Sequence, residues 1–172
     1  MKRSGMLLLA LCVLSVGCDE DTAPAPSNQP LVFTATMSAT QETTAVVGGE
    51  QNATGTATVT LTPTRDAAGA ITGGTFMFQF TVNNMPSTGN LILAHIHRGA
   101  AGVAGPVVVN SQLSAASAIP TPQGSGGFER SGLTVDVATV PAEIVANPAG
   151  FYFNVHSTAN PGGVVRGQLV AR

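Results

Sequence analysis

Alternation of apolar and polar side chains along three stretches of the chain constrains its fold more than any other feature. Residues 31–39, 56–62 and 75–82 each place an apolar residue at every second position, and the apolar face of the third stretch carries three phenylalanines. A period of two is typical of a β-strand with one buried face, whereas a helix repeats every 3.6 residues. The three stretches therefore predict strands with well-defined inward faces.

Shorter runs between turn signals predict further strands at 91–98, 106–110, 131–137, 150–157 and 164–171. The turn signals are Gly48-Gly49, Gly73-Gly74 and the segments 66–69 and 83–89. Residues 141–146 alone suggest a helical turn, and 20 glycines with 9% charged residues suit short strands joined by turns. We expect an all-β fold, an antiparallel Greek-key-like sandwich or barrel of about eight strands.

The first 17 residues are predicted to be a lipoprotein signal peptide. Lys2 and Arg3 precede the apolar run 6–14, and small residues then lead to Cys18. Residues 15–18 resemble the bacterial lipobox, with Ser15 at the position that usually holds leucine. We expect Cys18 to carry lipid and to anchor the mature chain to a membrane outside the cytoplasm. Without lipidation the chain would be secreted, and the pattern leaves open which membrane, inner or outer, holds the anchor.

Residues 18–30 are predicted to comprise the lipidated cysteine and a disordered tether, because the segment DEDTAPAPSNQP is acidic, proline-rich and without apolar periodicity. The β domain then covers residues 31–172. Cys12 lies in the segment that processing removes, so a mature chain with a lipidated Cys18 has no thiol left for a disulfide. The stability of the domain must then come from packing.

The charge balance argues against a nucleic-acid partner. Without Lys2 and Arg3, five basic residues face nine acidic ones, which gives a net charge near −4, and no lysine follows Lys2. A basic patch for nucleic acid or for anionic lipid is therefore not expected. The chain also lacks a nucleophile elbow, paired carboxylates and a phosphate loop followed by a helix or a lysine. Catalysis is disfavoured, and no catalytic residue is predicted.

All three histidines lie in two segments, 94–109 and 151–169. His95 and His97 are two residues apart, so on a strand they project from one face about 7 Å apart. If the strand that carries His156 is a neighbour, three imidazoles meet and form a site for one copper or zinc ion. The alternative is structural, with imidazoles that hydrogen-bond to the glycine-rich loops beside them.

Arg166 follows the third histidine and also has two interpretations. In the first, its guanidinium ties loop carbonyls or Glu42 together. In the second, it guides an anion toward an ion held by the histidines. The sequence leaves both interpretations open.

The two histidine segments, AHIHRGAAGVAGPVVV and FYFNVHSTANPGGVVRGQL, resemble the signature of the CHRD, or chordin-type, domain, which occurs singly in many bacterial secreted proteins. The resemblance covers residues 31–171. Gln41 and Glu42 stand where the family has an Asn-Glu-Val-Pro-Pro stretch, although residues 43–45 replace its prolines. The resemblance implies a binding or structural module with no established reaction and no known protein or cell-envelope partner.

The order of the histidines is also similar to that on the copper side of Cu/Zn superoxide dismutases. That resemblance implies that His95, His97 and His156 are copper ligands and that Arg166 is the arginine beside the substrate channel. The chain departs from that family because it has no fourth histidine to bridge two metals, no zinc ligand set and no disulfide. A mononuclear copper or zinc protein is therefore the alternative to a binding or structural module.

Overall fold

The computed structural model of the chain describes residues 27–172. The signal peptide predicted at 1–17 and the lipidation predicted at Cys18 lie outside these residues. The strands are β1 (Leu31–Ser38), β2 (Thr54–Arg65), β3 (Ile71–Asn83), β4 (Asn90–Arg98), β5 (Val107–Asn110), β6 (Ile119–Pro120), β7 (Gly126–Leu133), β8 (Phe151–Ser157), β9 (Val165–Gln168) and β10 (Val170–Ala171). The α-helix is α1 (Val140–Ala146), and single 3₁₀ turns occur at Ala39–Gln41, Ala115–Ser117 and Pro148–Gly150.

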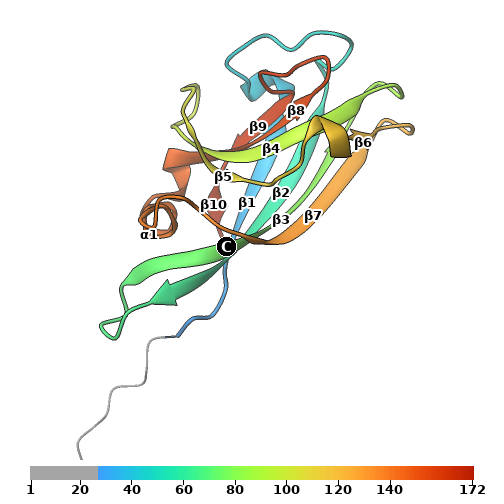
Figure 1. Cartoon of the computed structure of the whole chain (residues 1–172). Coiled ribbons are helices and arrows are strands. Elements are labelled where there is room, and N and C mark those ends of the chain that lie inside the picture. Colours follow the sequence, from blue (N-terminus) through green and yellow to red (C-terminus); the bar gives the residue numbers. More distant parts are fainter. Residues whose placement is uncertain (1–26) are drawn as a thin grey trace, which may run out of the picture.

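The strands form one antiparallel sheet that curls into a nearly closed barrel (Figure 1). Eight strands follow in the order β5-β4-β8-β9-β1-β2-β3-β7, while β10 pairs with β1 and β6 pairs with β4. The tip of the β2–β3 hairpin projects beyond the barrel at one end (Figure 1). At the other end, the loop after β1 meets the loop after β8 (Figure 1). The predicted all-β class, with about eight strands, is confirmed.

The inward faces predicted from alternation form the core of the barrel. Phe76, Phe78 and Phe80 are 1%, 0% and 2% exposed, and the apolar faces of β1 and β2 are buried with them. The Phe78 ring meets that of Phe153 edge to face, with 5.0 Å between the ring centroids. This contact joins β3 to β8 through the interior of the barrel. The helical turn expected near 141–146 is α1, which buries Val140 and Ile144.

Two predicted features are wrong in detail. The strand expected at 131–137 is β7, which begins five residues earlier, at Gly126, because the backbone there pairs with the free edge of β3. The turn expected at Gly73-Gly74 lies inside β3. A Cβ on Gly74 would lie 2.6 Å from Leu61 Cδ1 and 2.8 Å from the Thr62 carbonyl oxygen, so glycine permits close strand packing there.

Among residues 27–172, no helix is long and apolar enough to cross a membrane.

Candidate metal centre

Strand β8 is buried on both of its faces, which is unusual for a strand at the surface of an antiparallel barrel. Its inward face is apolar, with Phe153 and Val155 fully buried in the core. Its outward face carries Tyr152, Asn154 and His156, each no more than 6% exposed. A second buried layer, polar in character, therefore lies between the sheet and the loops that cover it.

The strand register brings the three histidines into this polar layer. β8 pairs with β4, which places His95 opposite Asn154, His97 opposite Tyr152 and His156 opposite Leu93. His95 and His97 share the outward face of β4, while the alternate residues Ala94 and Ile96 are fully buried on the core side. The neighbouring strands that the three-histidine hypothesis requires are thus present.

The three imidazoles face one another at short range. Nδ1 of His95 lies 3.2 Å from Nε2 of His156, and one ligating nitrogen from each of His95, His97 and His156 falls within 4.8 Å of the other two. Two nitrogens that each lie 2.0 Å from one ion are separated by about 3.3 Å in tetrahedral geometry and about 3.5 Å in trigonal geometry. The His95–His156 separation is close to these values, whereas the 4.8 Å span of the whole set exceeds them by about 1.3–1.5 Å.

Backbone carbonyls hold two of the rings by their outer nitrogens. Nδ1 of His97 donates to the Gly105 carbonyl at 2.9 Å, and Nδ1 of His156 donates to the Pro161 carbonyl at 2.9 Å. Because a carbonyl only accepts, each Nδ1 carries the proton and each Nε2 carries a lone pair. Hydrogen bonds of this kind fix the tautomer and the orientation of metal-bound histidines.

A purely structural role for the histidines does not explain the environment of His97 Nε2. Among the described residues it is the buried side-chain nitrogen or oxygen that has no hydrogen-bond partner. Buried polar atoms are almost always paired, and an unpaired one costs about 1–3 kcal/mol. The lone pair of this atom is therefore available to a ligand that the chain itself does not supply.

Burial keeps the three imidazoles neutral. The pKa of His95 is lowered from 6.5 to about 4, chiefly by burial and to a smaller extent by the neighbouring His156 and His97. Burial also lowers the pKa values of His97 and His156, against hydrogen bonds to Gly105 and Pro161 that raise them. The neutral ring is the form that binds a metal ion.

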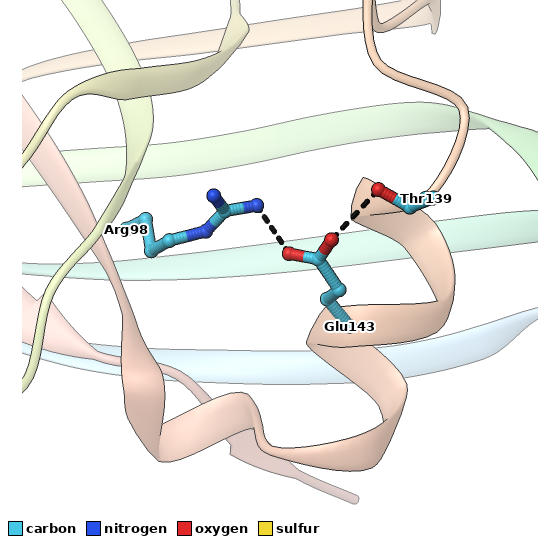
Figure 2. A network of polar contacts seen from close by, with 3 residues as sticks. All are labelled: Arg98, Thr139 and Glu143. Carbon is cyan, nitrogen blue, oxygen red and sulfur yellow. Dashed lines mark hydrogen bonds and ion pairs between the residues drawn. The ribbon is translucent and has the colours of Figure 1, made fainter.

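The loop after β4 supplies the carbonyl of Gly105, and its conformation depends on that glycine. A Cβ at this position would lie 1.6 Å from the Arg98 carbonyl oxygen. At the start of this loop, the exposed side chain of Arg98 pairs with Glu143 of α1, which in turn accepts a hydrogen bond from Thr139 (Figure 2). This surface ion pair links α1 to the end of β4, directly after His97.

A buried polar cluster holds the loop after β8, which supplies the carbonyl of Pro161. Glu50, which is 1% exposed, accepts hydrogen bonds from Ser157 Oγ and from Asn160 Nδ2. Asn160 also exchanges two hydrogen bonds with the backbone of Val47. Sequence analysis missed this cluster, because Glu50 is far from Asn160 in sequence and no periodic pattern marks either residue.

Arg166 and Tyr152 extend the polar layer away from the histidines. Arg166 is 2% exposed, and its Nη2 donates to the carbonyls of Ala100 and Val103 at 3.3 and 3.1 Å. Its guanidinium carbon lies 3.5 Å above the Tyr152 ring, and that ring is stacked on His97 with centroids 4.8 Å apart. Tyr152, which sequence analysis did not single out, therefore separates the arginine from the histidine cluster.

One interpretation of the sequence pairs Glu42 with Arg166. In the described residues these two side chains form no direct ion pair, and the ion pair present is Arg98–Glu143. Glu42 instead accepts a 2.6 Å hydrogen bond from Asn154 Nδ2. Burial raises the pKa of Glu42 from 4.5 to about 7, although the charge of Arg166 and the bond from Asn154 lower it. The polar layer thus ends in a half-buried carboxyl group near a buried cation.

Comparison with known proteins shows the family of the chain. The family model described as CHRD domain matches residues 33–169. The match includes all three histidines, Arg166, Tyr152 and both carbonyl-bearing loops. No curated protein and no solved structure matches the chain.

Proposed function

The chain belongs to the CHRD domain family, and on this premise we propose that it is a binding module whose three-histidine cluster holds a single copper or zinc ion. Family membership supports a binding or structural module. The finer assignment to a metal rests chiefly on one observation, the buried lone pair of His97 Nε2 that has no partner among the described residues. One ligating nitrogen from each of the three histidines lies within 4.8 Å of the other two, and His95 Nδ1 is 3.2 Å from His156 Nε2.

The chemistry of the cluster favours these two metals. Three neutral imidazoles suit zinc and copper, whereas calcium and magnesium require oxygen ligands. Among divalent ions, the Irving–Williams order favours Cu²⁺ over Zn²⁺ for nitrogen ligands. A three-nitrogen set would leave a fourth position for water or for an external ligand.

The competing structural interpretation explains part of the geometry. In that interpretation Nδ1 of His95 donates to Nε2 of His156, and the pair ties β4 to β8. It leaves His97 Nε2 without a role, whereas a metal ion would engage one nitrogen from each of the three histidines. The metal interpretation therefore accounts for more of the observed contacts.

A titration of the tag-free chain tests the metal proposal. Isothermal titration calorimetry at pH 7.5 should show one Cu²⁺ or Zn²⁺ bound per chain. His97→Ala should weaken binding by about 100-fold or more, because loss of a residue that merely supports a ligand already costs 10–100-fold. Gln79→Ala, at an exposed residue on the outward face of β3, is the control and should leave the affinity unchanged. Absence of binding, or equal affinity in His97→Ala and the parent, would reject the site.

We also propose that the module is exported and held outside the cytoplasm by lipid on Cys18. The support is the sequence alone: Lys2 and Arg3, the apolar run 6–14 and the small residues before Cys18. Cys18→Ala should move the protein from the membrane fraction to the soluble extracytoplasmic fraction, or block its processing. A Cys18→Ala protein that is processed normally and stays in the membrane would contradict the anchor.

A further inference from the structure

A polar cavity of about 370 Å³ lies beside Arg166, and no histidine lines it. Arg166 and Gln168 of β9 line it together with Glu42 and Thr43 from the loop after β1. Tyr152 and the three histidines do not line this cavity. Its volume is within the range of about 300–1,000 Å³ that is typical of small-molecule sites.

Arg166 presents unused hydrogen-bond donors beside this cavity. One face of its guanidinium is covered by Tyr152, and Nη2 is bonded to the carbonyls of Ala100 and Val103. Nε and Nη1 donate to no atom of residues 27–172. These donors are not among the fully buried atoms without a partner, and Arg166 lines the cavity. A guanidinium that is held rigidly and keeps free donors toward a cavity is suited to bind a carboxylate.

Glu42 supplies the opposite charge at the same cavity. Its Oε1 is bonded to Asn154, while no hydrogen bond within the described part of the chain reaches Oε2. Glu42 and Arg166 do not form an ion pair with each other. Burial raises the pKa of Glu42 to about 7, against the charge of Arg166 and the hydrogen bond from Asn154, which lower it.

We propose that this cavity binds a small zwitterion, with its carboxylate on Arg166 and its ammonium group on Glu42, the chemistry of an amino acid or a dipeptide. Because the cation and the carboxyl group line one cavity without pairing, a ligand of both charges satisfies each of them. An anion alone would be repelled by Glu42, and a cation alone by Arg166. This inference does not depend on a metal ion at the histidine cluster.

The dipeptide L-alanyl-L-alanine, with acetate and ethylammonium as single-charge probes, tests the proposal by titration of the full chain at pH 7.5, where both the peptide ammonium group and Glu42 are mostly charged. The dipeptide should bind with a Kd of about 1 mM or lower, and the single-charge probes at least tenfold more weakly. Glu42→Gln keeps an oxygen for Asn154 but removes the charge, so it should weaken dipeptide binding by about tenfold or more. Glu129→Gln removes the same charge from the exposed face of β7 and serves as the matched control.

The outcomes distinguish the alternatives. Loss of dipeptide affinity in Glu42→Gln but not in Glu129→Gln supports the zwitterion site, provided that thermal unfolding shows both variants to be folded. Acetate binding as tight as that of the dipeptide, and unchanged in Glu42→Gln, would identify a simple anion site and overturn the proposal. No binding of the dipeptide at about ten times the expected Kd would also overturn it. The titration contains no metal, so its failure leaves the metal proposal intact.

Discussion

Replacement of His95 by glutamine should make the metal-free domain less sensitive to acid. Burial holds the pKa of His95 near 4 in the folded chain, against 6.5 for an ordinary histidine. Between these pH values the unfolded chain binds a proton that the folded chain does not, so the free energy of unfolding falls as the pH falls. For a shift from 6.5 to about 4, the loss at pH 5 relative to neutral pH is about 2 kcal/mol. His95→Gln removes this contribution.

Urea unfolding in EDTA at pH 7.5 and pH 5 measures the effect. Glu42 acts in the opposite direction, because its folded pKa of about 7 is above its ordinary value of 4.5 and its protonation favours the folded state. Its contribution is present in both proteins and cancels in the comparison. The parent chain should lose about 2 kcal/mol more than His95→Gln between the two pH values. Losses that agree within about 0.5 kcal/mol would refute the assigned burial of the imidazole.

Two further predictions concern the core and the metal. Phe78→Ala should lower the free energy of unfolding by about 3–5 kcal/mol, because it leaves a cavity at a fully buried site against Phe153. Thr81→Ala, at an exposed position of β3, should lower it by less than about 0.5 kcal/mol. Similar losses for the two variants in chemical denaturation would show that the faces of β3 are assigned wrongly. Metal affinity should stay nearly constant from pH 7.5 down to about 6, because the three histidines have lowered pKa values and protons compete with the metal only at lower pH. A tenfold or greater loss of affinity across this interval, measured by competition with a chelator, would contradict the burial of the histidines.

The strands of the core could be predicted from the sequence because each side chain in them has one of two environments. Phe76, Phe78 and Phe80 face the interior and the alternate residues Met77 and Gln79 face outward, so alternation reports the structure directly. β7 gives no such signal. Its residues from Gly126 onward are held by pairing with the edge of β3, and pairing leaves no mark on the pattern of side chains.

The grouping of the histidines was also predictable, because His95 and His97 share a face and one strand adjacency brings His156 to them. The residues that hold the histidine cluster in place could not be predicted. Glu50 acts through Asn160 across a large sequence separation, and the carbonyl of Gly105 is positioned by the path of a loop. The paths of these loops depend on tertiary hydrogen bonds that no local propensity encodes.

X-ray absorption spectroscopy of the tag-free chain, loaded with Cu²⁺ or Zn²⁺ and then desalted, tests the metal proposal most directly. The proposal predicts one retained ion whose first shell contains three imidazole nitrogens at about 2.0–2.1 Å, with the imidazole scattering reduced by one third in His97→Ala. Loss of the ion on desalting, or a first shell of oxygen without imidazole scattering, would contradict the proposal and return the three histidines to a structural role.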